Sequence, residues 1–200
     1  LLDDWPADGL AVINADDVRV ADWQVRARPT RCLTFGVNCK ADYQAIDLQL
    51  NGFSGSNFVL QTPEQAVEVT LNVPGRQGIY NALAAAAVAD ALGISAITIR
   101  EGLAAVKPAP GRGGVAVLSP DASLIDDTYN ANPVAVRAAI DVLASESGRR
   151  RLVLGAMLEL GPDEEKLHAE LGAYAREAGL DELWAVGPEA APAAVAFGEG

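Results

Sequence analysis

The stretch LIDDTYNANPVAVRAAIDVLA, residues 124–144, decides the fold of the C-terminal half of this chain. Two apolar residues pass directly into a polar loop, and an apolar pattern of helical period follows the loop. Asn132 precedes Pro133, an order that suits an N-cap and the first position of a helix. The stretch therefore predicts a strand, a polar loop at its carboxyl end and a helix that begins near residue 133.

The same alternation continues on both sides of this stretch. We expect strands at 115–118, 123–126, 151–154 and 183–186, and helices at 133–145, 163–178 and 189–197. Strands that alternate with helices in this way indicate parallel pairing and a Rossmann-like open sheet.

The N-terminal half has a different pattern. Its first 75 residues are rich in short apolar or alternating runs that predict strands, and the last three runs suggest an antiparallel meander. The alanine-rich segment IYNALAAAAVADALG, residues 79–93, predicts a helix closed by Gly93, and a second helix is expected from Ser95 to about residue 105. The segment VKPAPGRGG, residues 106–114, marks a linker. We therefore expect two α/β domains, residues 1–108 and 109–200.

Composition excludes several classes of protein. The 200 residues are 50% hydrophobic and 21% charged, so the chain can bury a core. The net charge of −12, with no basic stripe, argues against nucleic-acid binding. The longest apolar run, residues 82–89, is too short to span a bilayer, and the N-terminus has no basic signal region. We expect a cytoplasmic protein with no membrane partner.

Metal chemistry based on histidine and cysteine is also excluded by the sequence. Cys32 and Cys39 are the only cysteines, their spacing fits no zinc motif, and His168 is the only histidine. A bound metal would need oxygen ligands, as Mg²⁺ does.

Three places hold polar residues that could bind a ligand. Asp127 follows a predicted strand, where ligands of an open α/β sheet bind. A carboxylate there can accept hydrogen bonds from ribose hydroxyls, and asparagine amides can pair with an adenine edge. The alternatives are that these polar residues cap a helix or form a solvated turn. Arg112 lies between glycines and suits a phosphate or carboxylate, unless it is a solvated linker residue. Asn81, early in an alanine-rich helix, requires either a capping role or a ligand.

Four motifs in this order and spacing resemble the Mur ligase family: GRQGIYNALAAAAVADALG, PAPGR, LIDDTYNANPVAVRAAIDVLA and RRLVLGAMLELG. The resemblance implies the latter part of a β-rich central domain with helices, followed by a truncated Rossmann-like C-terminal domain. It also implies an ATP-dependent ligase that joins an amino acid or dipeptide to a UDP-linked precursor through an acyl-phosphate. YNANP and LGAMLELG resemble the branch of the family that adds D-alanyl-D-alanine to a UDP-linked muramoyl tripeptide.

The resemblance also implies roles for particular residues. Asn81 is expected at the adenine and Asp127 at the ribose. Arg112 is the candidate catalytic residue, because its charge would offset the charge that moves in phosphoryl transfer. Asn130 and Asn132 are expected to line the same pocket or to position the loop. The implied cofactors are ATP and Mg²⁺, the substrates are a UDP-linked muramoyl peptide and D-alanyl-D-alanine, and the parent enzyme is expected to be a monomer.

Several departures from the family pattern leave alternatives open. The chain has no G-x-x-x-x-G-K-[ST] phosphate loop, so we expect that loop and the Mg²⁺ ligands upstream of Leu1. Gln77-Gly78 replaces the usual His-Asn pair, and Ala156 replaces a common aspartate. The alternatives are another Mur-type amino-acid ligase, or a truncated fragment that binds nucleotide without catalysis. His168 stands where the family often has a histidine, and it could equally be a helix-face or capping residue.

Overall fold

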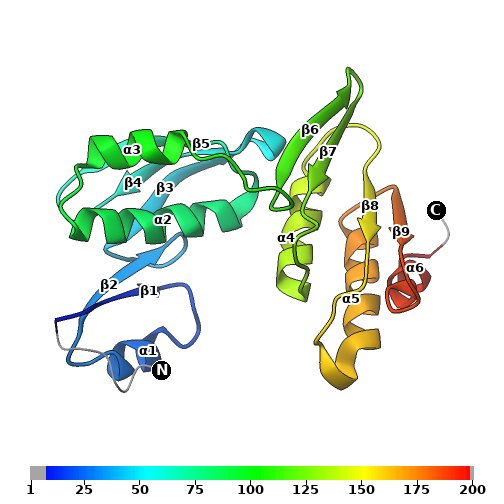
Figure 1. Ribbon diagram of the computed structural model, residues 1–200, viewed down its shortest axis with the longest axis horizontal. Helices are drawn as coiled ribbons and strands as arrows, with labels where there is room; N and C mark the ends of the chain where they lie inside the picture. Colours follow the sequence, from blue (N-terminus) through cyan, green and yellow to red (C-terminus); the bar gives the residue numbers. More distant parts are fainter. Residues whose placement is uncertain (1–7, 199–200) are drawn as a thin grey trace. The chain divides into compact units, whose positions relative to one another are not determined.

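The computed structural model describes residues 8–198, which form two compact units (Figure 1). The first unit comprises residues 8–51, 55–72 and 76–106. The second comprises residues 107–198 together with the short segments 52–54 and 73–75.

A five-stranded sheet is the framework of the first unit. Its spatial order is β1-β2-β3-β4-β5, with β1, β2 and β3 parallel and β3, β4 and β5 antiparallel. These strands confirm the predicted β-rich region and its terminal meander. Their bounds are Leu10–Asn14, Arg31–Gly36, Tyr43–Leu50, Ser56–Gln61 and Ala66–Leu71.

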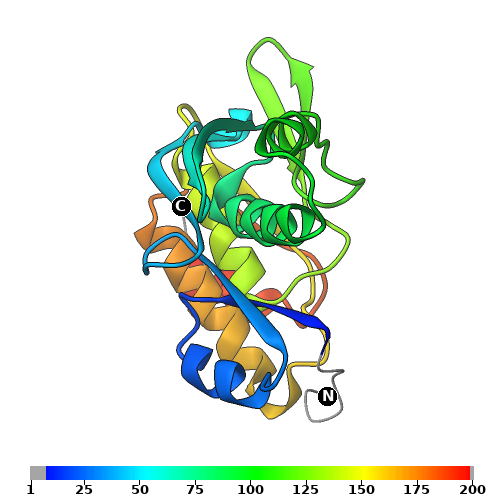
Figure 2. The same ribbon diagram turned by 90° about the vertical axis from the view of Figure 1, so that its left-hand side faces the viewer.

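Helices cover this sheet on both faces. Helix α1 (Val20–Arg26) packs on Ala11 and Ile13 of β1, whereas Ala87 of α2 (Gly75–Ala91) contacts Leu33 on the opposite face. Helix α3 (Ala96–Ala104) lies beside α2 and packs against β5 (Figures 1 and 2).

Local capping signals define the ends of α2 and α3 as the sequence predicts. Gly93 follows α2 in the left-handed region, with φ of 81°. The Ser95 hydroxyl accepts a hydrogen bond from the Thr98 N–H at 3.2 Å and caps α3. Helix α1 was not predicted, and the side chain of its N-cap residue, Arg19, makes no capping hydrogen bond.

The second unit contains two separate two-stranded sheets. Strands β6 and β7 form an antiparallel hairpin, and β8 and β9 are parallel. The prediction of parallel pairing is therefore wrong for β6 and β7, because only Pro120 and Asp121 connect them and a parallel pair needs a long crossover. The strand bounds are Gly114–Ser119, Ala122–Asp126, Arg151–Leu154 and Glu182–Ala185.

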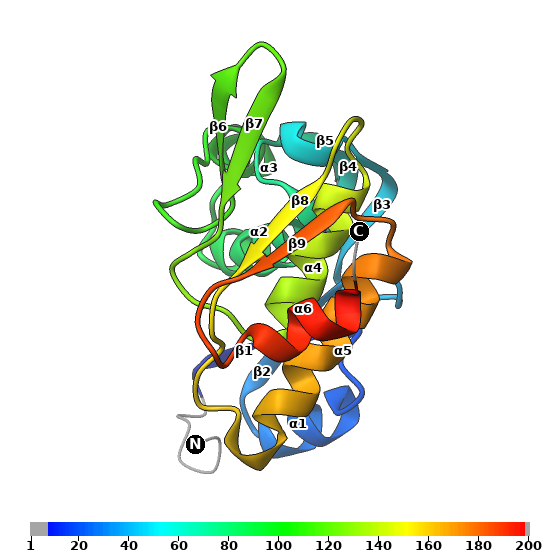
Figure 3. The same ribbon diagram turned by 90° about the vertical axis from the view of Figure 1, so that its right-hand side faces the viewer.

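Three helices of the second unit pack in one core with β8 and β9 (Figure 3). They are α4 (Pro133–Ala144), α5 (Glu164–Glu177) and α6 (Ala191–Phe197), and they bury Leu154 and Leu183. On the other face of β8 and β9, Val153 and Trp184 are 60% and 57% exposed. Short 3₁₀ helices occupy Gly52–Ser54 and Gly161–Asp163.

One edge of β7 and one edge of β8 carry no partner strand within residues 8–198. Strand β7 pairs only with β6, and β8 pairs only with β9. Each of these two edges therefore presents backbone N–H and C=O groups that no neighbouring strand satisfies.

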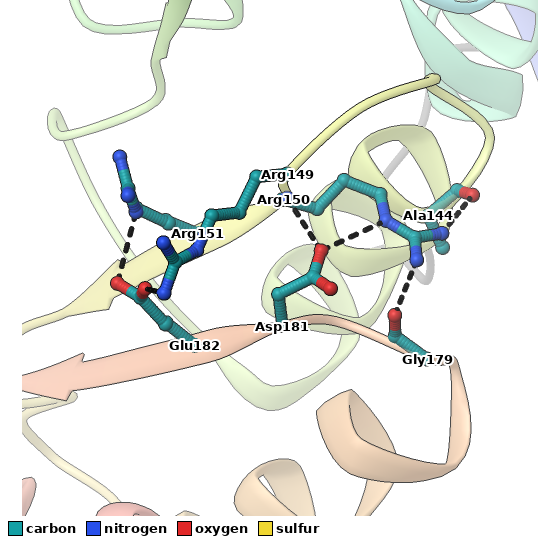
Figure 4. A network of polar contacts seen from close by, with 7 residues as sticks. All are labelled: Ala144, Arg149, Arg150, Arg151, Gly179, Asp181 and Glu182. Atoms are coloured by element: carbon teal, nitrogen blue, oxygen red, sulfur yellow. Dashed lines mark hydrogen bonds and ion pairs between the residues drawn. The ribbon is translucent and has the colours of Figure 1, made fainter. Parts of the chain in front are cut away.

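A network of charges joins the starts of β8 and β9 (Figure 4). Asp181 accepts a hydrogen bond from the Arg150 N–H at 2.7 Å, and the Arg150 guanidinium donates to the carbonyls of Gly179 and Ala144 at 2.6 and 3.2 Å. The Glu182 carboxylate pairs with both neighbouring arginines, Arg149 and Arg151. The hydrogen bonds of Arg150 thus link the C-terminal ends of α4 and α5 to the starts of β8 and β9.

We predict that Gly172→Ala destabilises the second unit. A Cβ at Gly172 of α5 would lie 1.9 Å from the carbonyl oxygen of Ala193 in α6, so the two helices would have to separate. We expect a loss of about 1–3 kcal/mol in the free energy of unfolding, measured by urea denaturation.

Gly102→Ala in α3 is the matched control, because a Cβ there would meet no atom within 4 Å. We expect that change to stabilise the first unit by about 0.5–1 kcal/mol. An unchanged unfolding midpoint for Gly172→Ala would contradict the close approach of α5 and α6.

Candidate functional site

Two backbone hydrogen bonds join the glycine-rich segment before β6 to the polar loop after β7. The Gly113 N–H donates to the Asp126 carbonyl at 2.9 Å, and the Tyr129 N–H donates to the Gly111 carbonyl at 3.0 Å. Gly111 has φ of 72°, and a Cβ there would lie 3.0 Å from the Tyr129 nitrogen. A glycine is therefore needed at this position for the two segments to come together.

This arrangement stacks Arg112 on Tyr129. The guanidinium carbon lies 3.9 Å from the centroid of the tyrosine ring, which is a cation–π geometry. Tyr129 is nevertheless 67% exposed. Arginine and tyrosine together thus form a flat, charged surface that solvent or a ligand can reach.

The two aspartates of the loop have different environments. Asp126 accepts hydrogen bonds from the Thr128 hydroxyl and N–H, at 2.7 and 3.2 Å, and these bonds lower the pKa of its carboxyl. Partial burial raises the pKa of the Asp127 carboxyl, which outweighs the lowering by the Gly113 N–H and the Arg112 guanidinium. Asp126 therefore shapes the loop, whereas the Asp127 side chain makes no hydrogen bond to another side chain within residues 8–198.

The two asparagines of the loop also differ. Asn132 Oδ1 accepts from the Ala135 N–H at 2.9 Å and caps α4, as its position before Pro133 predicts. Its side-chain oxygen is therefore used structurally. Asn130 is exposed and lines a cavity with Asp127 and Tyr129.

This cavity, of about 820 Å³, lies between β7 and β8. Its walls include the unpaired edges of both strands and the loops that follow them. The loop after β7 contributes residues 127–131, and the loop after β8 contributes Gly155, Ala156, Leu158 and Glu159. In an open α/β sheet, loops at the carboxyl ends of strands are where ligands bind. Ala156, where the family commonly has aspartate, thus faces the cavity.

The structure brings four of the five predicted site residues together in the second unit. Arg112, Asp127 and Asn130 lie on two segments joined by backbone hydrogen bonds, and Asn132 caps the next helix. Asn81 belongs to the first unit, on an exposed position of α2 two turns after its start. Gln77 and Gly78 lie one turn before it, and Gly78 is buried.

Sequence reasoning missed a polar cluster centred on Asp16 in the first unit. The Asp16 carboxylate accepts hydrogen bonds from the N–H groups of Val37, Asn38 and Cys39, the closest at 2.8, 3.0 and 2.7 Å. It also accepts from the Tyr80 hydroxyl at 2.8 Å. The signal was present, because Asp16 lies two residues after β1, and Asp126 likewise stands at the carboxyl end of β7.

Asp16 thereby fixes the start of α2. Burial alone would raise its pKa, but the hydrogen bonds that it accepts outweigh this effect and hold the pKa far below the usual range for aspartate. Burial and the bond to Asp16 raise the pKa of Tyr80. Arg76 extends the cluster by donating to Asn38 Oδ1 at 2.9 Å. Tyr80 immediately precedes Asn81, so the cluster sets the position of that candidate residue.

Residues 8–198 contain neither a cluster of metal-binding side chains nor a helix suited to span a membrane. No group of three or more histidine, cysteine or acidic residues is arranged to hold a metal ion. In the same residues, no helix combines the length and the apolar character needed to cross a membrane.

Comparison with known families matches both halves of the chain. Residues 1–89 match the Mur ligase middle domain, and residues 112–198 match the domain described as "Mur ligase, glutamate ligase domain". The chain belongs to the Mur ligase family.

Named relatives are UDP-N-acetylmuramoyl-tripeptide–D-alanyl-D-alanine ligases. The Escherichia coli enzyme is 38% identical over 196 residues, which are 98% of this chain and 43% of that protein. The Haemophilus influenzae enzyme is 35% identical over 92% of this chain and 39% of its own length. The chain thus spans about two fifths of the length of these relatives.

Solved structures agree with this result. MurF from Acinetobacter baumannii superposes with a TM-score of 0.86 at 36% identity, over 93% of this chain and 40% of that one. MurF ligase from Thermotoga maritima, solved in complex with ADP, gives a TM-score of 0.80 at 28% identity, over 96% and 43% of the two chains. The predicted family and fold class, a β-rich part of the Mur middle domain followed by part of the C-terminal domain, are confirmed.

We predict that Asp16→Asn destabilises the first unit at neutral pH. The amide nitrogen cannot accept a hydrogen bond, so at least one of the donors around Asp16 loses its partner, at a cost of about 1 kcal/mol. Because the pKa of Asp16 is lower in the folded chain, its contribution is fully present above the unfolded value of about 4 and is lost as pH falls below it. The difference between the two chains should therefore shrink on acidification.

Thermal and urea unfolding at pH 7 and pH 3 would measure this difference. Asp17→Asn is the control, because Asp17 is exposed and, within residues 8–198, its carboxylate accepts only from the nearby Arg19 N–H. Equal stability of Asp16→Asn and the unaltered chain at pH 7 would show that the cluster does not hold the loop.

Proposed function

We propose that this chain is part of an ATP-dependent ligase that joins D-alanyl-D-alanine to a UDP-N-acetylmuramoyl-tripeptide. In this reaction a carboxylate oxygen of the tripeptide attacks the γ-phosphorus of ATP, and ADP leaves. The amine of D-alanyl-D-alanine then attacks the acyl carbon of the acyl-phosphate, phosphate leaves, and the nitrogen loses a proton. The second unit contributes contacts to the nucleotide and to the dipeptide, and we propose a monomeric, cytoplasmic parent enzyme.

The observation that carries this proposal is the cluster formed by Arg112, Tyr129 and Asp127. The Asp127 carboxylate is an acceptor suited to the two ribose hydroxyls. The Arg112 guanidinium, stacked 3.9 Å from the Tyr129 ring, can donate several hydrogen bonds to phosphate oxygens without losing its stacking partner. Membership of the Mur ligase family and the ADP complex of the Thermotoga maritima relative support this reading.

The remaining candidate residues have narrower roles in this proposal. Asn130 lines the cavity beside Asp127 and can hydrogen-bond a nucleotide or peptide edge. Asn132 caps α4 and so holds the loop in place. Asn81 contributes from the first unit, at the adenine. Mg²⁺ would neutralise phosphate charge when bound, and we place none of its ligands on residues 8–198, which hold no metal-binding group of three or more acidic, histidine or cysteine residues.

We predict that the chain binds ATP in the presence of Mg²⁺ and that Asp127→Ala weakens this binding at least tenfold, about 1.4 kcal/mol. Isothermal titration calorimetry measures both proteins directly. Asp121→Ala is the matched control, because it removes an exposed carboxylate at the far end of the hairpin, in the turn between β6 and β7. If Asp127→Ala binds ATP as the unaltered chain does, the ribose role is wrong; if neither protein binds, the nucleotide role of this chain is wrong.

We predict that Arg112→Ala weakens ATP binding more than adenosine binding. Because Arg112 is proposed to interact with phosphate, the affinity for adenosine should fall only through the indirect effect of losing the stack on Tyr129. Calorimetric titrations of Arg112→Ala with ATP and with adenosine would be compared with the same titrations of Arg100→Ala, which removes an exposed arginine of α3. Equal losses for the two ligands would contradict the phosphate role.

A further inference from the structure

His168 is a fully buried titratable residue that the proposed function does not use. It lies on α5 with 0% of its surface exposed. Its Nε2 lies 3.0 Å from the backbone nitrogen of Met157, and its Nδ1 lies 2.8 Å from the carbonyl oxygen of Glu164. Both ring nitrogens are therefore engaged by backbone groups.

These partners determine the tautomer of the ring. The Met157 N–H can only donate, so Nε2 must present a lone pair. Nδ1 therefore carries the proton and donates it to the Glu164 carbonyl, one turn earlier in α5. The imidazole thus links the loop after β8 to the helix that follows it, with its donor on Nδ1 and its acceptor on Nε2.

The loop that His168 holds lines the same cavity as Asp127. Within residues 8–198, the bond to His168 is the only hydrogen bond that joins residues 155–159 to another element. Met157 is fully buried in the core, whereas Ala156, Leu158 and Glu159 on either side of it line the cavity. Fixing Met157 therefore fixes the residues that face a ligand.

Backbone strain in this loop makes such a fixed point necessary. Glu159 has φ of 62°, in the left-handed region that residues other than glycine rarely adopt. A strained conformation persists only where surrounding contacts determine it. Contacts that do so include the buried Met157 side chain, the hydrogen bond from the Met157 N–H to His168, and Leu160, which packs on the same core.

We infer that His168 is a positioning residue for the ligand-binding loop 155–159, acting through its acceptor nitrogen on the Met157 N–H. This inference rests on the proposed function for its consequence in binding, because the loop shares its cavity with Asp127 and Asn130. His168 itself touches no ligand, since it is buried behind Met157.

The first test compares His168→Leu with His168→Gln by amide hydrogen exchange in the ¹⁵N-labelled chain. Glutamine can place an acceptor oxygen near the position of Nε2, whereas leucine fills the space without one. We expect the Met157 amide to exchange at least tenfold faster in His168→Leu, relative to amides of β8, and to be restored in His168→Gln. Ile140→Val, which removes one methyl group from the same core on α4, should leave that ratio unchanged. An unchanged ratio in His168→Leu would overturn the inference.

The second test measures the affinity of the same variants for ATP with Mg²⁺ by calorimetry. We expect a loss of about tenfold in His168→Leu, with recovery in His168→Gln and no loss in Ile140→Val. Faster exchange at Met157 without a loss of affinity would refute the link to binding. If the unaltered chain binds no ATP, the proposed function fails, and the exchange measurement alone decides whether His168 holds the loop.

Discussion

The pair of backbone hydrogen bonds between residues 111–113 and 126–129 is the constraint on which the candidate site depends. It extends the β6–β7 pairing, which ends at Gly114 and Asp126, into the two segments that carry Arg112 and Asp127. Because Gly111 adopts a left-handed conformation, Tyr129 can approach the backbone closely and Arg112 can lie flat on its ring. The charge of Arg112 then lies next to Asp127 without neutralising it through a direct ion pair.

Both units have an aspartate at or near the carboxyl end of a strand: Asp16 lies two residues after β1, and Asp126 is the last residue of β7. Asp16 collects three backbone N–H groups and a tyrosine hydroxyl, which makes it part of the framework of the first unit. Asp126 likewise accepts hydrogen bonds from Thr128 in its own loop. The Asp127 carboxylate makes no hydrogen bond to another side chain within residues 8–198, so it can still accept hydrogen bonds from a ligand. In both places a hydrogen-bonded aspartate shapes a loop beside a residue that we propose contacts the ligand, Asn81 in the first unit and Asp127 in the second.

The sequence was sufficient wherever the deciding interactions are local. Asn132 and Ser95 each cap the helix that follows by accepting from the N–H three residues ahead, and Gly93 follows the end of α2, so these predicted ends agree with the structure. The start of α2 at Gly75, four residues before the predicted start, was not predicted. The way in which strands pair was harder to predict from the sequence. The Pro120-Asp121 turn makes β6 and β7 antiparallel, although the alternation of strands and helices favoured a parallel sheet.

Long-range hydrogen bonds could not be predicted from single positions. Asp16 and Tyr80 are 64 residues apart, and the bond between His168 and Met157 joins a helix to a loop whose conformation no sequence pattern specifies. Of the candidate site, residue types at strand ends and the cap by Asn132 were predictable, but which loop residues line the cavity depended on geometry. The unpaired edges of β7 and β8 add a further consequence. A single extended segment between them could satisfy both rows of backbone groups and merge two small sheets into one cooperative folding unit, so the rigidity of the second unit depends on what fills that gap.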